Sequence, residues 1–514
     1  MKRSLLLLFL SCSSFFNLRA SDGDSIWANN FIHDIYFTFS QTPYWDTLLA
    51  NHTADVYTRV DMVFDGRSLP SCGIKFKGNS SFNNPSTKKS FKIDLNEYVS
   101  GQDYDGIKKF NLNNGFKDPS MLREKLALDF MNAHNVTAPR CNYARVYLNG
   151  TYWGLYTIVE EINSKFLKQH YPDNDGNLFK GDPSGDLKYY GAAQSSYYSH
   201  YELQNNNTQN DWSDLVAAIN IINNTPSSTF FDSLETVFDS WSYLNYMATT
   251  NMFANLDSYI GSGHNYFMFD DSTGHHFRWI AWDVNESFGN FQMTFSPTTI
   301  QTMPYDFVST PTTSRPLASK MLADPTYRAM YVSCFCSIMP FFNNTTLDPV
   351  IDSLANVIRS SVYSDNLKSY TNQQFEDNIT MQVGGTPGIK SFISARVASL
   401  TTQLAFSGCW LGTPALSDAT PTISIYPNPA QDAVTLVLPA ASNASQLKVM
   451  DVNGKEIENI SISQVAFNTY IISTSEMANG IYFLVLNTED KARLTSKLVV
   501  LHQGNTHYKL TIVP

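Results

Sequence analysis

The chain has 514 residues, of which 43% are hydrophobic and 16% are charged, and its formal net charge is −11. This composition is typical of a globular protein and excludes a largely disordered one. The acidic balance, without any basic run, disfavours nucleic-acid binding, because proteins of that class need a positive surface against the phosphates.

The first twenty residues predict a signal peptide. Lys2 and Arg3 precede an apolar run at 5–10, and the small residue Ala20 stands at the expected cleavage point. This order of basic, apolar and small residues is typical of export signals. A lipoprotein signal that uses Cys12 is a less favoured alternative. No later stretch is long and apolar enough to span a bilayer, so we expect an exported protein that is soluble or attached to a surface.

Removal of this signal leaves five cysteines, an odd number, so at least one thiol must be unpaired. Cys334 and Cys336 are separated by one residue in an apolar helical run. Packing is the favoured role for both.

Strand patterns dominate the chain as far as residue 160. Alternating apolar residues predict strands around 35–39, 60–64, 73–77, 88–95, 144–148 and 154–159, with helices at 45–49 and 121–133. Asp65-Gly66 and Asn149-Gly150 are typical hairpin turns.

Helical patterns dominate after a long segment, 184–211, that is rich in Ser, Asn, Tyr and Gln and predicts a surface excursion. The predicted helices cover 212–222, 227–238, 241–254, 317–339, 347–359 and 389–404. Strands followed by helices predict an α+β domain over 21–410.

The composition changes again in a Pro/Ser/Thr-rich linker at 411–422. Short strands then follow at 423–426, 433–438, 447–452, 469–472, 480–486 and 494–500, which predict a small β-sandwich over 423–501, with an extension at 502–514. This region has no convergent set of catalytic residues, so we expect no chemistry there.

Three oxygen-bearing side chains carry the strongest chemical signal. Asp257 follows a predicted helix, Asn265 precedes an alternating run, and Asp283 follows the apolar strand end 279–282. In phosphoryl transfer one carboxylate orients the attacking hydroxyl, while an Asn/Asp pair holds the divalent cation. This set of three is rich in oxygen and free of thiol and imidazole, so Mg²⁺ or Mn²⁺ is the fitting metal, with Asn285 and Glu286 as further oxygen ligands. Each acid alone could equally cap a turn.

A nucleotide-binding site would need phosphate-binding groups upstream. The loop Gly78-Asn79-Ser80-Ser81 lies between two strands and could contact the phosphates, or it could be an ordinary turn. Lys88 and Lys89 begin the next strand, and Lys89 shares its parity with the apolar residues of that strand. A lysine on an apolar face needs a neutralising partner, which favours Lys89 as the phosphate contact, although both lysines could extend to solvent.

Two glutamates could complete such a site. Glu124 lies on the predicted helix 121–133, where a glutamate could pair with the nucleotide lysine as in kinases, or could join a surface charge lattice. Glu160 and Glu161 end an apolar strand and could contact an adenine edge, an ion or the lysine, or could be solvated.

Together these segments resemble the CotH family of spore-coat-type atypical protein kinases. The resemblance runs from about residue 35 to 404 and rests on the segments 78–81, 88–91, 122–126, 149–160, 282–289, 315–317 and 388–393. It implies an ATP- and divalent-metal-dependent kinase fold, related to secretory-pathway protein kinases, with a sheet-rich N-lobe and a helix-rich C-lobe. The acceptors would be Ser/Thr hydroxyls of extracytoplasmic proteins.

By position, the resemblance implies that Lys89 binds phosphates, Asp257 is the catalytic acid/base and Asp283 is a metal ligand that Asn265 assists. This chain has Asn285 where many members have a second Asp. It also has Lys77 where an Arg is common, which removes a bidentate phosphate contact.

The C-terminal region resembles the sorting domain of the type IX secretion system of Bacteroidota-like bacteria, through the segments 426–430, 449–455, 480–483 and 496–499. This resemblance implies secretion or cell-surface attachment, with the type IX machinery as a partner.

Two functional hypotheses follow. The first is an exported protein kinase, and the second is a catalytically silent surface or matrix protein that uses the same fold to bind proteins or glycans. A metal-dependent hydrolase is disfavoured, because no histidine cluster accompanies the acids.

Overall fold

The computed structural model describes residues 22–27, 31–272 and 274–405 and, in the C-terminal region, 424–426, 428–437, 447–451, 455–458, 460–466, 469–487 and 493–502. The predicted signal peptide, the linker 411–422 and residues 503–514 of the predicted extension lie outside the described residues. The chain divides into two compact units, 1–411 and 412–514. Within the described residues, no helix combines the length and apolarity that a membrane span requires.

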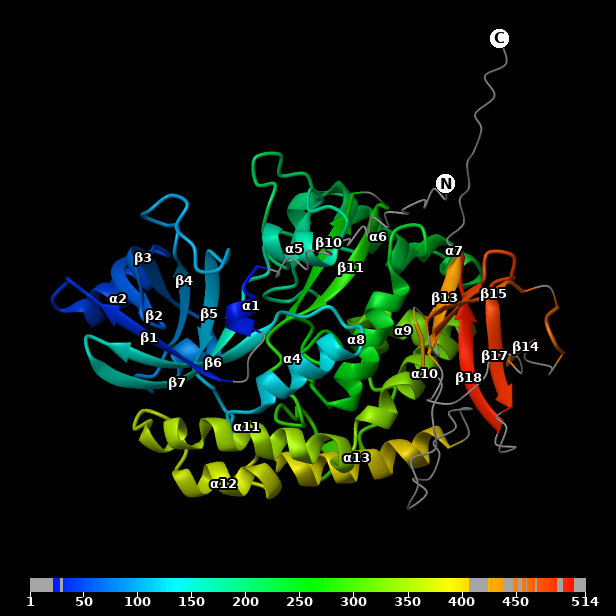
Figure 1. The fold of residues 1–514 in the computed structure, drawn as a ribbon. Helices are drawn as coiled ribbons and strands as arrows, with labels where there is room; N and C mark the ends of the chain where they lie inside the picture. Colours follow the sequence, from blue (N-terminus) through cyan, green and yellow to red (C-terminus); the bar gives the residue numbers. More distant parts are fainter. Residues whose placement is uncertain are drawn as a thin grey trace, which may run out of the picture. The chain divides into compact units, whose positions relative to one another are not determined.

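The first unit begins with a closed β-barrel, drawn in blue and cyan in Figure 1. Its strands, in barrel order, are β1 (Ile32–Thr38), β2 (Thr58–Phe64), β3 (Arg67–Lys77), β4 (Ser90–Asp94), β5 (Lys109–Asn113), β7 (Thr151–Glu160) and β6 (Cys141–Leu148). Neighbours are antiparallel except β1 and β6, which pair in parallel and close the barrel. Closure leaves no exposed sheet edge. Three short helices accompany the barrel: α1 (Asp24–Trp27), α2 (Tyr44–Thr53) and α3 (Ser80–Asn83).

The alternation seen in the sequence forms the barrel core. Ile35, Phe37, Phe91 and Ile93 are fully buried in one apolar cluster. Both predicted hairpin turns are present, with positive φ at Asp65 and Gly66 and at Asn149 and Gly150, the geometry that matches the twist of the flanking strands. The strand β5 was not predicted.

The rest of the first unit is mainly helical. Its helices are α4 (Arg123–Ala133), α5 (Ser164–His170), α6 (Ser213–Asn224), α7 (Phe230–Leu234), α8 (Ser240–Met252), α9 (Pro316–Ala323), α10 (Pro325–Ile338), α11 (Asn344–Ser364), α12 (Asn372–Thr380) and α13 (Ile389–Leu404). Short 3₁₀ turns lie at Gln194–Ser196, Ser227–Thr229, Ile300–Thr302, Thr312–Ser314 and Met339–Phe341. We call this part, residues 161–405 with α4, the helical part.

A small antiparallel sheet lies within the helical part. Its order is β11 (His276–Ala281), β10 (Tyr266–Asp271), β8 (Leu178–Lys180) and β9 (Glu202–Leu203). The Trp279 ring stacks on Tyr266 with centroids 4.0 Å apart, and both side chains belong to the large apolar core.

Two predictions for this part were wrong. The expected helix at 317–339 is split into α9 and α10, because Pro325 cannot continue a helix and Asp324 caps the second helix by accepting from the backbone N–H groups of Thr326 and Tyr327. The segment 184–211 is not simply a surface excursion, since Tyr197 and Tyr201 are buried in the core.

The helices α11, α12 and α13 lie side by side along the lower edge of the first unit in Figure 1. α11 contacts β7 of the barrel as well as α13 of the helical part. It therefore fastens the two parts of the unit to each other.

The second unit contains two antiparallel sheets. One has the order β12 (Ser424–Tyr426), β13 (Ala433–Val437), β16 (Thr469–Ser473) and β15 (Ile462–Ala466), and the other β14 (Leu447–Asp451), β17 (Gly480–Asn487) and β18 (Arg493–Val500). Apolar side chains of both sheets share one buried cluster, as expected of a sandwich.

The cysteines follow the prediction in part. Cys72 and Cys141 are buried free thiols, which confirms the expectation of at least one unpaired thiol. Cys336 packs against the large apolar core, as predicted, but it is also disulfide-bonded, which the sequence analysis did not predict.

Candidate functional site

A cleft of about 510 Å³ is lined by residues of the barrel and of the helical part. Its volume is within the range of sites that hold small molecules. Twelve of the residues singled out in the sequence line it: Lys77, Gly78, Asn79, Ser80, Ser81, Glu124, Glu161, Asp257, Asn265, Asp283, Asn285 and Glu286. Residues far apart in the chain therefore share one cavity.

The backbone conformation at position 78 explains why the 78–81 loop begins with glycine. Gly78 follows β3 with φ +86°, a conformation that side chains rarely adopt. A Cβ at this position would stand 2.2 Å from the Ser81 Oγ. Any other residue at the start of this loop would therefore strain the turn into the cleft.

Lys88, Lys89 and Glu160 do not line the cleft. The Lys89 ammonium donates to the carbonyl oxygens of Phe82 and Asn84, at 2.6 and 2.5 Å. The Lys88 ammonium donates to the Asp365 carboxylate at 2.6 Å. These placements correct the expected nucleotide contacts, and the physical reason is that β4 begins only at Ser90, so the strand parity does not extend to either lysine.

The Glu160 carboxylate is held by Arg140, whose Nη2 and Nε donate at 2.6 and 3.0 Å. The neighbouring Glu161 lines the cleft instead. Parity explains the exchange, because successive residues at a strand end point to opposite sides.

Four lysines line the cleft, among them Lys77, which the sequence analysis noted only where an Arg is common in the family, and Lys92, which it did not select. Lys77 ends β3, and its ammonium donates to Asn113 Oδ1 at 3.1 Å and stands 5.1 Å from the Trp282 ring centroid. Lys92, on β4, pairs with Glu161 at 2.6 Å. The position of Lys77 directly before Gly78, on the parity opposite to the buried Ile74 and Phe76, was the signal that could have found it.

Asn113 connects Lys77 to α4, since its Nδ2 donates to Glu124 Oε1 at 2.6 Å. Burial raises the pKa of Glu124 to about 8; the Asp283 carboxylate adds to this effect and Lys77 opposes it. Burial also lowers the pKa of Lys77, against the attraction of Asp283 and the two glutamates. Both groups are therefore displaced toward their neutral forms.

Asp257 is surrounded by polar groups from its own loop. Its Oδ1 accepts from Ser262 Oγ at 3.1 Å and lies 3.3 Å from His264 Nε2, while the Asn265 side chain donates to its backbone oxygen at 3.0 Å. Burial raises the pKa of Asp257; His264 acts in the opposite direction and Asp283 reinforces the rise. His264 is a further cleft residue that sequence reasoning did not select.

Three residues of the cleft have a left-handed backbone. Asn265, Asp283 and Lys117 all have positive φ, at +63°, +52° and +56°. Non-glycine residues rarely adopt such values, and they concentrate at functional sites where the surrounding structure holds them.

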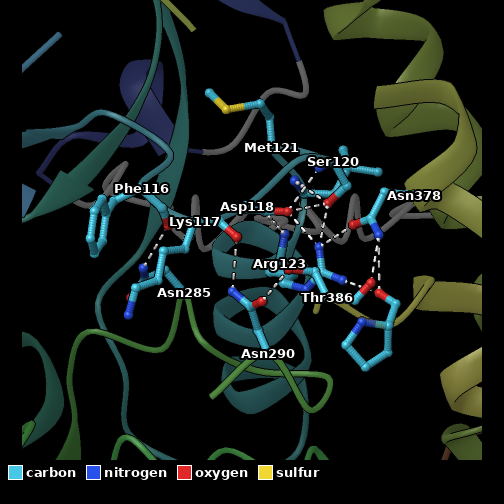
Figure 2. Close-up of polar contacts among 12 residues, drawn as sticks. Phe116, Lys117, Asp118, Ser120, Met121, Arg123, Asn285, Asn290, Asn378 and Thr386 are labelled. Carbon is cyan, nitrogen blue, oxygen red and sulfur yellow. Dashed lines mark hydrogen bonds and ion pairs between the residues drawn. The ribbon is translucent and has the colours of Figure 1, made fainter. Parts of the chain in front are cut away.

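Two asparagines tie the turn after β11 to the loop before α4, as Figure 2 shows. The Asn285 Nδ2 donates to the backbone oxygen of Phe116 at 3.3 Å, and the Asn290 Nδ2 donates to that of Lys117 at 3.1 Å. In the same region the Lys117 ammonium lies 3.3 Å from Glu286 Oε1. Burial raises the pKa of Glu286 to about 7, and Lys117 lowers it in part.

A buried arginine holds the other side of the loop (Figure 2). Arg123 is fully buried, and its Nη1 donates to Asp118 Oδ1 at 2.5 Å and to Asn378 Oδ1 at 2.8 Å. The Thr386 hydroxyl then donates to Asn290 Oδ1 at 2.9 Å. This network joins α4, α12 and the turn after β11, so it fixes the floor of the cleft.

The charges of the cleft suit a cation together with an anion. Eight carboxylates and four lysines line it. Within the part of the chain that the structure describes, no group of three or more His, Cys, Asp or Glu side chains could hold a metal ion by itself. Mg²⁺ is usually held by one or two carboxylates together with substrate phosphates and water. Asp283, with the amide oxygens of Asn265 and Asn285, fits that mode of binding.

Two family models match this chain. The family described as CotH kinase protein matches residues 74–400, and the family described as secretion system C-terminal sorting domain matches residues 424–501. The inner spore coat protein H of Bacillus subtilis (strain 168) is 25% identical over 205 residues, covering 39% of this chain and 55% of that protein.

Two invasins of Rhizopus delemar are also similar. Invasin CotH7 is 22% identical over 361 residues, covering 66% of this chain and 57% of its own, and invasin CotH2 is 25% identical over 281 residues, covering 51% and 46%. The chain thus spans about half the length of the curated relatives that it matches. A chain of the Shewanella oneidensis MR-1 HipA, HipB and operator DNA complex gives a TM-score of 0.29 at 10% identity, covering 58% of this chain and 59% of that chain, and a likeness this low carries no argument.

Proposed function

Because this chain belongs to the CotH kinase protein family, we propose that it is an exported protein kinase that transfers the γ-phosphoryl group of ATP to Ser/Thr hydroxyls of extracytoplasmic proteins. The secretion sorting domain at 424–501 indicates secretion or cell-surface attachment, with the type IX machinery as partner. The observation that carries the proposal is the single cleft that contains Asp257, Asn265 and Asp283 together with Lys77 and Glu124.

The barrel side of the cleft would bind the nucleotide. Lys77 would contact the phosphates, in place of Lys89, because it is the lysine beside the 78–81 loop and its ammonium is held by Asn113. Glu124, which shares Asn113 with Lys77, would fix the lysine as the helical glutamate of a kinase does. A sheet-rich part, a helix-rich part and a polar cleft lined by both are the arrangement that a kinase requires.

The helical side would hold the cation and the acceptor. A bound Mg²⁺ or Mn²⁺ would neutralise phosphate charge, and Asp283 with the amide oxygens of Asn265 and Asn285 would hold it. Asp257 would orient the acceptor hydroxyl and take its proton. Ser262 and His264 keep its carboxylate in place, and its raised pKa makes it a better proton acceptor than an exposed aspartate.

The test is transfer of radiolabelled phosphate from ATP by the purified mature protein. We expect Asp257→Asn to lose at least about 100-fold in transfer rate while keeping its thermal stabilisation by ATP with Mg²⁺ or Mn²⁺. Asp283→Asn should lose both properties. Asp306→Asn serves as the matched control, since Asp306 is a half-buried acid outside the cleft that pairs with Arg328 at 3.1 Å. A melting temperature unmoved by ATP with either cation contradicts the proposal.

A second candidate is a catalytically silent surface protein that binds proteins or glycans. It is favoured by the exposed rings of Tyr189, Tyr190 and Tyr198 in the 184–211 segment, and by the absence of charge at Asn285. Glycan or cell binding that needs no nucleotide and persists in Asp283→Asn, without phosphoryl transfer, supports this alternative.

A further inference from the structure

Among the residues that the structure describes, no group forms a hydrogen bond with one of the two carboxylate oxygens of Glu286. The residue lines the cleft and is 3% exposed. Its Oε1 lies 3.3 Å from the Lys117 ammonium, whereas its Oε2 is buried without a hydrogen-bond partner. A buried carboxylate oxygen without a partner is costly, so its retention in a cleft points to a ligand.

The surroundings of Glu286 identify the kind of ligand. The carboxylates of Asp257 and Asp283 line the same cleft, and Lys117, the ion-pair partner of Glu286, is itself 47% exposed. Several carboxylates that line one cleft favour a cation, and hard oxygen ligands favour Mg²⁺ or Mn²⁺.

The neighbouring Asn285 does not supply a second negative charge for such a cation. Its side chain carries no charge, and its amide nitrogen is used to hold the backbone oxygen of Phe116 (Figure 2). A site that relied on Asp283 with amide oxygens alone would therefore present a single negative charge to a divalent ion.

We infer that Glu286, through Oε2, supplies the second carboxylate that holds the divalent cation of this cleft together with Asp283. The inference rests on the proposed function and deepens it, because it places the charge missing at position 285 one residue further along the same turn. Lys117 then positions Glu286 through Oε1 and takes no part in holding the cation.

The test measures Mn²⁺ binding directly, by electron paramagnetic resonance of the free ion, with and without a non-hydrolysable ATP analogue. Glu286→Gln keeps the size of the side chain and removes its charge, and we expect the Mn²⁺ affinity to fall more than about tenfold. Restoring a carboxylate next to it, in Asn285→Asp/Glu286→Gln, should recover most of that loss. Lys117→Gln is the matched control, since it breaks the ion pair and leaves the carboxylate, so the affinity should stay the same or rise.

The outcomes separate this inference from the proposed function. If Asp283→Asn weakens Mn²⁺ binding but Glu286→Gln does not, the inference is overturned and the proposed site stands. If neither variant changes the affinity, the cation site itself is refuted. A loss in Lys117→Gln equal to that in Glu286→Gln also overturns the inference, because Glu286 would then act only by holding Lys117. Should Glu286→Gln not fold, Glu286→Asp, which retracts the carboxylate by one methylene, must weaken binding in the same direction.

Discussion

Replacing Lys88 by methionine should destabilise the first unit strongly and leave nucleotide binding intact. The Lys88 ammonium and the Asp365 carboxylate form an ion pair of 2.6 Å in which the side chains are 3% and 1% exposed. Asp365 follows α11 and also accepts from the backbone N–H of Leu155, on β7, at 3.1 Å. The pair therefore fastens the barrel to α11.

The magnitude follows from burial. Removing one partner of a buried ion pair costs about 3–5 kcal/mol, because the other charge stays buried and unpaired. Folded domains have only about 5–15 kcal/mol of net stability, so each single variant, Lys88→Met or Asp365→Asn, loses a large fraction of it. The double variant leaves no unpaired charge, and it should cost about 0.5–3 kcal/mol less than the sum of the two singles.

Urea unfolding followed by tryptophan fluorescence measures these costs, with equal slopes as the condition for comparing midpoints. The loss of unfolding free energy in Asp365→Asn should become smaller as pH rises. Burial already holds the pKa of Lys88 below 10.5 in the folded protein. Between this folded pKa and the unfolded value the unfolded chain binds more protons, so the free energy of unfolding rises with pH. Single variants that cost less than about 1 kcal/mol, or a strictly additive double variant, refute the reasoning. Loss of thermal stabilisation by ATP in Lys88→Met would return this lysine to the nucleotide site.

Three further predictions concern the cleft. Lys77→Met should lose the thermal stabilisation by ATP with Mg²⁺ that Lys89→Met retains; an equal response of the two variants contradicts the assignment. In the protein without ligands, the free energy of unfolding should fall as pH rises from 4.5 to about 8, because folded Glu124 keeps a proton that the unfolded chain releases near 4.5. Glu124→Gln should flatten this pH dependence, which urea titrations at several pH values measure. An unchanged pH dependence means that Glu124 is not the group responsible. Gly78→Ala should lower the free energy of unfolding by about 1 kcal/mol or more, because φ is +86° there and the added Cβ meets Ser81. It should also weaken ATP binding measured by calorimetry. A variant with normal ATP affinity shows that the loop makes no phosphate contact.

The convergence of Asp257, Asn265 and Asp283 was predictable from chain order. Asn265 directly precedes β10 and Asp283 follows β11 by two residues, and the two strands pair antiparallel with Tyr266 opposite Ala281. The start of one strand and the end of the next therefore lie at the same edge of the sheet. The antiparallel pairing of consecutive strands, which a short connection favours, brings Asn265 and Asp283 to one edge, and the Asn265 side chain reaches Asp257 by donating to its backbone oxygen at 3.0 Å.

The lysines could not be predicted in the same way. Which of them face the cleft depends on where β4 begins, and a displacement of one residue exchanges the two faces of a strand. In the observed register Lys77 pairs with Ser90, and Lys75 with Lys92, so Lys88 and Lys89 precede the ladder. Strand ends are set by packing of the closed barrel and by the partner Asp365, which is remote in sequence.

Arg123 illustrates the same limit. In the sequence it belongs to a charged stretch at the start of a helix and is compatible with a surface position. In the structure it is fully buried, and besides Asp118 its Nη groups donate to Asn378 Oδ1 and the backbone oxygen of Pro387 at 2.8 and 2.5 Å. Nothing local in the sequence identifies partners that lie in the last third of the first unit.

The ionisable groups of the cleft would be more stable in their charged forms with a ligand bound than they are in the free protein. Lys77 and Glu124 carry opposite charges and share Asn113, yet burial displaces the pKa of each toward its neutral form. Their mutual attraction is therefore weaker than the desolvation free energy of the two buried charges. A phosphate beside Lys77 and a cation beside Asp283 would each supply the missing opposite charge. The positive φ of Asp283 and Asn265 adds a conformational cost that the free protein also carries. Fixed polar groups held at such a cost are the preorganised environment in which electrostatic stabilisation of transferred charge is most effective, since no further rearrangement is needed when the reacting groups arrive.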